Sequence, residues 1–424
     1  GVLLMALTVP VSFAFFAVNI VGLIVFVDFD IGLKQLVANV TTSITSFTLV
    51  PVPLFLLMGE LFYHTGVAVR VFDAFDALLG RLPGRLSYLT VAGGTVFAAL
   101  SGSSMANTAM LGSLMVPEMT RRGYKKHMAM GPILGTGGLA IIIPPSALAV
   151  LLGSLARIDI GQLLIAGVLP GVLLAGFYAV TIYVLVKLDP EAAPAYEVPA
   201  MRALERVRIV FVNLAPMGFV IFMVIGLILL GVATPSEAAA FGVLGVLIVS
   251  AGFGKLTRDA IVRSLQGTMK VTGMVFLIIM ASSTFSQILA LSGATAGLID
   301  WATALDVSPT LMLAVMFVIL LVLGCLMEQV SIMMLTVPIF FPLAQSLGFD
   351  LIWFGVVVML SLEIGLITPP FGLGLFVLIG VAPKGTTLFE AAAAGLPYIA
   401  CAVALVACLV AFPPIALYLP SLMQ

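Results

Sequence analysis

Charged residues are scarce in this chain. Asp, Glu, Lys and Arg together make up only 9% of its 424 residues, whereas about one quarter of the residues of a soluble domain are charged. A domain with a water-facing surface on every side is therefore excluded. The 18 basic and 19 acidic residues leave a net charge of −1. Without an excess of positive charge, we expect no nucleic-acid partner.

Histidine and cysteine are also rare, which excludes several kinds of site. Cys325, Cys401 and Cys408 lie in apolar segments without the CxxC spacing of a metal site, and they suggest no disulfide framework. His64 and His127 both fall in basic loops. A membrane-embedded hydrolase is the alternative from the enzymes, but the chain has no HExxH and no Gly-x-Ser-x-Gly motif. We therefore expect neither enzyme activity nor a catalytic residue.

Apolar residues, in contrast, are abundant. They make up 62% of the chain, and the mean hydropathy is +1.27. Four apolar stretches, at 2–27, 128–153, 209–231 and 391–418, exceed the roughly 20 residues that a helix needs to cross a bilayer. Further spans are predicted at 49–63, 161–187, 237–254, 271–291 and 351–380. The sequence thus predicts an all-α polytopic membrane protein.

The basic residues lie almost entirely on one side of these spans. Lys and Arg concentrate in cytoplasmic loops, so this side is assigned to the cytoplasm. Only Lys34 and Arg157 fall on the opposite side. The cytoplasmic set is Arg70, Arg81, Arg85, Arg121, Arg122, Lys125, Lys126, Lys187, Arg202, Arg206, Arg208, Lys255, Arg258, Arg263, Lys270 and Lys384. The opposite side also carries the acidic residues Asp28, Asp30, Asp159, Asp300, Asp306 and Asp350.

Two segments are each expected to enter the membrane and to return to the side from which they came. Residues 86–120 run between two basic loops and are apolar apart from a central Ser101-Gly-Ser-Ser104. Each half is too short for a comfortable crossing, so we expect a re-entrant helical hairpin with this sequence at its tip. Segment 308–345 lies between acidic residues of the other side. It predicts a second hairpin that opens outward.

An internal repeat accounts for the two hairpins. An offset of 225 residues aligns a proline, a glycine and a Pro-Pro pair in the two halves: Pro117 with Pro342, Gly123 with Gly348, and Pro144-Pro145 with Pro369-Pro370. Because the hairpins open to opposite sides, the halves are predicted to be inverted-topology repeats, as in many secondary transporters. The predicted parts are a first repeat (1–187), a loop and linking span (188–231) and a second repeat (232–424). Each repeat holds a hairpin and a Pro-Pro-broken helix, at 128–153 and 351–380.

The Pro-Pro breaks carry the expected chemistry. Two consecutive prolines remove amide donors and leave carbonyl groups without helical partners. Such backbone is tolerated at membrane depth only inside protein or beside a cavity, where unwound carbonyls and hydroxyls bind Na⁺ and helix N-termini bind anions. We therefore expect a hairpin tip to meet a break in each half and to bind a cation together with a carboxylate. The alternative is that the prolines only kink the helices and that the small tip residues only permit close packing.

Two further patterns concern charged residues near the membrane surface. Segment 66–80 alternates apolar and charged residues at helical spacing, which is typical of an interfacial helix. A counterpart is expected at 293–305. Glu118 lies beside Arg121 and Arg122, and we expect it to form a structural ion pair rather than an ion site.

Several motifs together resemble the large membrane subunit of tripartite ATP-independent periplasmic (TRAP) transporters over essentially the whole chain. They are PLFLLMGEL (53–61), LSGSSMA (100–106), IPPS (143–146), Pro338 with Pro342, and IGLITPPFGL (364–373). The resemblance implies sodium-coupled uptake of a small anionic solute across the bacterial inner membrane. It also implies elevator-type transport and scaffold domains, a small four-helix membrane subunit and a periplasmic solute-binding protein.

The resemblance assigns roles to individual residues at two or more Na⁺ sites. The first would use Ser103, Ser104 and Asn107 with backbone around Gly137 and Pro144, and the second Glu328 and Ser331 with Thr368 and Pro369. The residues expected at the substrate are Ser101, Gly102, Pro145, Ser146, Glu363, Pro370 and Gly372.

Two other transport functions compete with this assignment. A stand-alone Na⁺- or H⁺-coupled anion carrier of a related hairpin family would share the hairpins, but it would need neither a small subunit nor a binding protein. A passive channel fits less well, because paired breaks favour occluded sites over a continuous pore. The identity of the solute does not follow from this chain, since first-contact specificity in such systems would belong to the binding protein.

The charge pattern makes a topology prediction. A single cysteine replacing Arg122 should react with a membrane-impermeant thiol reagent only from the cytoplasmic side, and one replacing Asp350 only from the periplasmic side. Both variants need a background in which the three native cysteines are replaced. Labelling of positions 122 and 350 from the same face would contradict the inverted repeat.

Overall fold

A computed structural model describes most of the chain, namely residues 9, 11–27, 29–80, 82–196, 202–304, 307–370, 372–383 and 385–423. Four charged residues used above to assign the topology lie outside this part: Asp28, Arg81, Asp306 and Lys384. Every regular element among the described residues is helical. The predicted all-α class is confirmed.

The elements follow one another along the chain with short connections. In order they are α2 (Val11–Phe26), α3 (Phe29–Ile44), the turn η1 (Phe47–Leu49), α4 (Pro51–His64), α5 (Ala68–Leu78), α6 (Arg85–Ser101), α7 (Ser104–Arg121), α8 (Lys126–Ile142), α9 (Ala147–Ala156), α10 (Ile160–Leu188), η2 (Pro190–Ala192), α11 (Ala203–Ile221), the π-helical turn η3 (Phe222–Gly226), α12 (Leu227–Leu229), α13 (Pro235–Gly252), α14 (Arg258–Leu291), α15 (Ala294–Ala304), α16 (Pro309–Gly324), α17 (Gln329–Ser346), α18 (Leu351–Ile367), α19 (Leu373–Val381), α20 (Leu388–Ala411) and α21 (Pro414–Ser421).

The described helices meet the requirement for a polytopic membrane protein. Seven are long and apolar enough to cross a bilayer: Phe47–His64, Ile160–Leu188, Leu204–Leu229, Pro235–Gly252, Arg258–Leu291, Gln329–Ser346 and Leu388–Ala411. The pair α8 and α9 makes an eighth if it is counted as one span bent by 45°. The described residues also form shorter apolar helices, among them α16 and α18.

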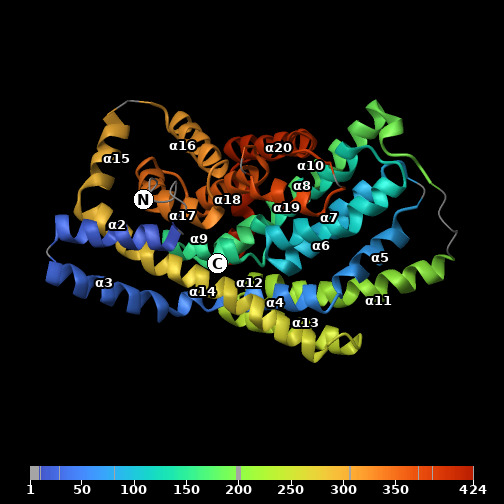
Figure 1. Ribbon diagram of the computed structural model, residues 1–424, viewed down its shortest axis with the longest axis horizontal. Helices are drawn as coiled ribbons and strands as arrows, with labels where there is room; N and C mark the ends of the chain where they lie inside the picture. Colours follow the sequence, from blue (N-terminus) through green and yellow to red (C-terminus); the bar gives the residue numbers. More distant parts are fainter. Residues whose placement is uncertain are drawn as a thin grey trace.

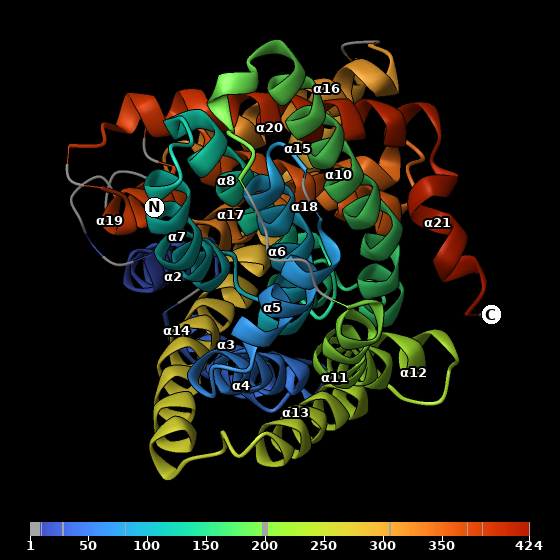
Figure 2. The same ribbon diagram turned by 90° about the vertical axis from the view of Figure 1, so that its right-hand side faces the viewer.

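The helices form two layers. One contains α2, α3, α4, α11, α13 and α14. Of these, α3, α4, α11, α13 and α14 lie in the lower part of both views, and α2 lies above α3 (Figures 1 and 2). In this layer α4 packs on α13 and α14, and α14 also packs on α2 and α3. The second layer contains α6 to α10 and α16 to α20. Its centre is α8, which contacts α6, α7, α10, α18 and α20.

Two central helices are buried on all sides, and most of their residues are apolar, as expected for helices enclosed by other helices. Every residue of α8 from Met128 to Ile142 is buried, and so is every residue of α18 from Ile352 to Ile367. Glycines let neighbours approach α8 closely. A β-carbon added at Gly135 would lie 2.7 Å from Cδ1 of Tyr398 on α20.

The segments predicted as hairpins and broken helices have turns at the expected positions. Helices α6 and α7 meet at Gly102 and Ser103, and α16 and α17 are joined by residues 325–328. Helix α8 gives way to α9 across 143–146, and α18 gives way to α19 across 368–372. These bounds do not determine how each segment is oriented in a membrane, so the inverted repeat and the division into 1–187, 188–231 and 232–424 stay predictions.

Other helix bounds differ from the sequence expectation for physical reasons. Helix α3 was not among the predicted spans, because it is amphipathic rather than continuously apolar. Helix α14 begins at Arg258 instead of 271, since Thr257 caps it by accepting a hydrogen bond from Ala260 N at 3.1 Å. The span expected at 391–418 is two helices, because α20 ends at Ala411 and Pro413 precedes α21. Hydropathy locates the apolar section of a helix but does not locate its ends.

The segments 66–80 and 293–305 contain α5 and α15, as expected for their helical spacing. Glu118 pairs with both Arg121 and Arg122 at 2.6 Å, which confirms the predicted structural ion pair. Arg85 is the buried charge in this region. Its guanidinium lies 2.9 Å from the carboxylate of Asp76 on α5, and its side chain is only 4% exposed.

Asp76→Asn should destabilise the protein, because it leaves the buried Arg85 guanidinium without a counter-ion. Arg85 keeps hydrogen bonds to the Asp76 carbonyl and the Tyr196 hydroxyl, so we expect a loss of about 1.5–3 kcal/mol. The matched control is Asp259→Asn, which removes the exposed pair with Arg263 and should cost about 0–1 kcal/mol. Thermal unfolding in detergent measures both, and equal shifts would contradict this role for Asp76.

Candidate functional site

The first hairpin tip lies directly against the first Pro-Pro break. Gly102 ends α6 with φ of 59°, a left-handed conformation that favours glycine. A β-carbon there would lie 2.9 Å from the carbonyl oxygen of Pro145. Ser103 then caps α7 by accepting a hydrogen bond from Ala106 N at 3.4 Å. The Ser101-Gly-Ser-Ser104 sequence is thus a helix end followed at once by a helix start.

The break has the same local construction. Pro144 and Pro145 are buried, and Ser146 caps α9 by accepting a hydrogen bond from Ala149 N at 3.2 Å. A β-carbon on Gly102 would also lie 3.8 Å from the amide nitrogen of Ala147. The N-termini of α7 and α9 therefore lie beside the same turn. Helix N-termini carry partial positive charge and favour bound anions.

Four buried side-chain oxygens on α6, α7 and α8 form no hydrogen bond within the described residues. The Asn107 side chain donates to the Thr136 carbonyl at 2.9 Å, which places α7 against α8. The atoms left without a hydrogen bond are Ser101 Oγ, Ser104 Oγ, Asn107 Oδ1 and Thr136 Oγ1. All four residues are at most 4% exposed. Buried polar atoms in proteins nearly always have a partner, so this group of oxygens is suited to a bound cation.

Thr136 was not among the residues expected from the sequence. It lies within Gly135-Thr-Gly-Gly138 in the otherwise apolar α8, and this isolated hydroxyl among glycines is the signal that marks it. Gly137, which was expected near the first Na⁺ site, touches α7. A β-carbon there would clash with the Thr108 hydroxyl, so the close approach of α7 and α8 requires glycine.

The second hairpin tip is held against α18. A β-carbon at Gly324, the last residue of α16, would lie 2.7 Å from the Cα of Gly365. At the tip itself, Ser331 is fully buried and its hydroxyl donates to Glu328 Oε1 at 3.2 Å. Glu328 and Ser331, the two residues predicted at this tip, are therefore in contact.

The second break is more open than the first. Pro369 and Pro370 are exposed, whereas Pro144 and Pro145 are buried. The Thr368 hydroxyl donates to the Ile364 carbonyl at 2.6 Å. Gly372 lies over the end of α18, where a β-carbon would be 2.8 Å from the carbonyl oxygens of Leu366 and Thr368. The two halves are thus alike in chain order but differ in how far each break is enclosed.

Glu363 lies between three helices rather than at the second tip. It is 1% exposed, and its Oε1 accepts a hydrogen bond from the Tyr178 hydroxyl of α10 at 2.9 Å. A β-carbon at Gly138 of α8 would clash with its Cγ. Glu363 therefore joins α18, α8 and α10, and within the described residues its Oε2 forms no hydrogen bond. Its role at the substrate stays a prediction.

Comparison with known proteins then decides the family. The family model described as "Tripartite ATP-independent periplasmic transporter, DctM component" matches residues 2–415. This chain belongs to the DctM family. The match confirms the predicted family resemblance, and with the apolar spans it makes the chain a multi-pass protein of the inner membrane.

Curated DctM relatives extend over nearly the whole chain. The C4-dicarboxylate TRAP transporter large permease protein of Pseudomonas aeruginosa is 33% identical, over 92% of this chain and 90% of its own length. The sialic acid TRAP transporter large permease protein of Vibrio cholerae is 29% identical, over 97% and 95%. The ectoine TRAP transporter large permease protein of Halomonas elongata is 28% identical, over 92% and 90%. All three are named as permeases.

A solved structure shows that the fold is known. The crystal structure of the YdaH transporter of Alcanivorax borkumensis covers 92% of this DctM chain and 90% of its own, with a TM-score of 0.67. The sequences are only 14% identical. The likeness therefore concerns the fold alone.

Gly137→Ala should disrupt the packing of α7 on α8 at the first tip. The added methyl group clashes with Thr108, and such overpacking costs about 1–3 kcal/mol. Gly176→Ala on α10 is the control, because nothing lies within 4 Å of its added carbon and helix propensity favours alanine. The melting temperature in detergent should fall for the first variant and stay or rise for the second. The reverse order would show that α7 and α8 do not pack as described.

Proposed function

We propose that this chain is the large transport subunit of a transporter that takes up a small organic anion together with Na⁺. A small four-helix membrane subunit and a periplasmic solute-binding protein would complete the system, as the family description "tripartite" supports. The solute would carry a carboxylate, of the sugar-acid or related type. Two of the relatives are named for carboxylate solutes, C4-dicarboxylate and sialic acid.

The observation that carries the proposal is the group of unpartnered oxygens at the first hairpin tip. Na⁺ in secondary transporters binds to neutral side-chain oxygens and to carbonyls of unwound backbone. Ser104, Asn107 and Thr136 offer such oxygens in the buried interior, and the carbonyl groups around Pro144 lie at the adjacent break. Ser103 acts indirectly in this arrangement, because its hydroxyl already caps α7.

The same turn offers a reason why the binding of Na⁺ and the binding of the anion would be coupled. The N-termini of α7 and α9 favour an anion beside Gly102, Pro145 and Ser146. A cation bound among the neighbouring oxygens adds positive charge in a site of low dielectric, so each ion binds better when the other is present. Such coupling between sites is typically worth about 1–3 kcal/mol.

A second Na⁺ would bind at the other tip. Glu328 and Ser331 are already hydrogen-bonded to each other, and Thr368 with Pro369 follows the helix that this hairpin crosses. For movement we propose an elevator. The layer with both hairpins and both breaks would slide as a transport domain against a scaffold formed by the layer of α2 to α4, α11, α13 and α14.

Ser104→Ala and Thr136→Val each remove one proposed Na⁺ ligand with little change in volume. Losing such a ligand costs about 1–3 kcal/mol, or roughly 5- to 150-fold in affinity. We expect the Na⁺ concentration for half-maximal thermal stabilisation of the purified protein to rise roughly tenfold in each variant. Choline in place of Na⁺ corrects for ionic strength.

The matched control is Ser113→Ala on the same helix. The Ser113 hydroxyl donates to the Met110 carbonyl at 2.9 Å and takes no part in the proposed site. Its Na⁺ dependence should equal that of the unmodified protein. Unchanged Na⁺ dependence in both Ser104→Ala and Thr136→Val would refute the assignment of the first site and favour the packing interpretation of the tip.

A further inference from the structure

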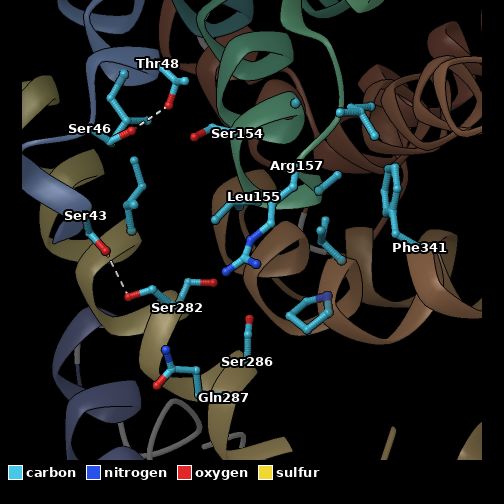
Figure 3. Close-up of a pocket in the computed structure, with 18 of the residues that line it drawn as sticks. Ser43, Ser46, Thr48, Ser154, Leu155, Arg157, Ser282, Ser286, Gln287 and Phe341 are labelled. Carbon is cyan, nitrogen blue, oxygen red and sulfur yellow. Dashed lines mark hydrogen bonds between the residues drawn. The ribbon is translucent and has the colours of Figure 1, made fainter. Parts of the chain in front are cut away.

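A large cavity lies between the two layers (Figure 3), and none of the hairpin-tip residues named above is among those that line it. Its volume is about 990 Å³, and it is lined by residues of α3, η1, α9, α14 and α17. This is at the upper end of the range for sites that hold one small molecule, which is about 300–1,000 Å³. Helices α3 and α14 come from one layer, whereas α9 and α17 come from the other.

The lining is rich in hydroxyl and amide groups and carries one formal charge. Polar residues on it include Ser43, Ser46, Ser154, Ser282 and Gln287. Arg157 is the single charged residue among those that line the cavity. Figure 3 shows its side chain extending into the cavity towards Ser282 and Ser286. Within the described residues, Arg157 forms no ion pair.

The backbone at Arg157 is also unusual. It ends α9 with φ of 56°, in the left-handed region, and in the described part of the chain every other residue with positive φ is glycine. A glycine would adopt this conformation without strain. An arginine at such a position points to a binding role for its side chain, because strained backbone conformations concentrate at binding and catalytic sites.

The surrounding polar groups are fixed by hydrogen bonds between α3 and α14. Asn39 donates to Gln287 at 2.6 Å and accepts from it at 3.0 Å, and Ser43 donates to Ser283 at 2.9 Å. These contacts hold one wall of the cavity in place before anything binds. A pre-arranged wall lowers the entropy lost on binding.

We propose that Arg157 binds the carboxylate of the transported solute and that the hydroxyl-rich wall binds hydroxyl groups on the rest of it. The guanidinium suits a carboxylate, to which it can donate two parallel hydrogen bonds. One cation in the lining accounts for one carboxylate, so the solute class is a hydroxylated monocarboxylate, such as a sugar acid, rather than a dicarboxylate. This inference rests on the proposed transport of an organic anion and narrows its substrate class.

The position of Arg157 relative to the first tip supports an entry site. Helix α9 runs from Ser146 at the Pro-Pro break to Arg157 at the cavity, and its 10 residues span about 15 Å. The solute would bind at Arg157 first and then move along α9 towards the N-termini of α7 and α9. The charge pattern of the sequence places Arg157 on the periplasmic side, where a solute would arrive.

The test is binding of defined organic anions to the purified full-length chain in detergent, measured by calorimetry with and without Na⁺. The hydroxylated monocarboxylates are D-gluconate, D-galacturonate and N-acetylneuraminate, succinate is the dicarboxylate, and D-glucose is the uncharged control. We expect at least one sugar acid to bind, succinate to bind at least roughly tenfold more weakly, and glucose not to bind. Binding of none of the sugar acids, or tighter binding of succinate, would overturn the substrate class.

Two variants at position 157 test the site. Arg157→Gly removes the guanidinium and suits the left-handed backbone, so the protein should melt at the same temperature or higher while sugar-acid affinity falls roughly 10- to 150-fold. Arg157→Lys should retain part of the affinity. Arg263→Gln, an exposed arginine in a surface pair, is the matched control and should bind as the unmodified protein does. Unchanged affinity in Arg157→Gly would overturn the role of Arg157.

These outcomes are separable from a failure of the proposed function. Na⁺-dependent stabilisation measured without any organic anion reports on the hairpin-tip oxygens and should be the same in Arg157→Gly as in the unmodified protein. If Na⁺ does not stabilise the unmodified protein, sodium coupling is refuted. The comparison of sugar-acid affinities at position 157 would still decide the anion site.

Discussion

The contact between Gly102 and the carbonyl of Pro145 is the interaction on which the candidate site depends. A helix broken inside a membrane exposes backbone groups that lipid cannot satisfy, so the break must be covered by protein. The first hairpin supplies that cover, and glycine allows its close approach, because a β-carbon at position 102 would lie only 2.9 Å from the carbonyl oxygen of Pro145. Once the tip lies on the break, the caps of α7 and α9 and the unpartnered oxygens around Asn107 are brought together.

The central position of α8 follows from the same requirement. This helix must touch the hairpin on one face and α18, α10 and α20 on the others, and its glycines leave room for each neighbour. Large side chains from those neighbours fill the space, as Tyr398 does beside Gly135 and Glu363 does beside Gly138. Close packing around α8 therefore sets the distance between the tip, the break and the buried carboxylate. The second half has a similar crossing at Gly324 and Gly365, but its break is exposed.

The proposed Na⁺ site and the proposed entry site for the anion lie at different places in the molecule. The first tip provides neutral oxygens in the buried interior, which suit Na⁺. The cavity between the layers provides the guanidinium of Arg157, which forms no ion pair within the described part of the chain, and hydroxyl groups around it. Helix α9 connects the two locations, starting at one and ending at the other. A sliding movement of one layer against the other would change this cavity directly, because its walls come from both layers.

The sequence alone determined the features that depend on local chemistry. Scarcity of charge and long apolar runs determined the membrane class, because hydrophobic length is a property of each segment. The Ser101-Gly-Ser-Ser104 and Pro-Pro motifs located the turns, since a glycine in the left-handed conformation, a serine cap and a missing amide act within a few residues. The family resemblance, rather than a local signal, grouped Ser104, Asn107 and Pro144 in one Na⁺ site, and that site stays a proposal.

Only the tertiary structure decided which distant segments share a surface. Thr136 joins the oxygens of the first tip through its contact with Asn107, and no local pattern links those two residues. Helix α3 lacks a continuous apolar run, yet Asn39 on it pairs with Gln287, 248 residues away. The cavity at Arg157 depends on that pairing, on the end of α9 and on the middle of α17. Its existence is a matter of packing between layers, which hydropathy and motif spacing along one segment do not encode.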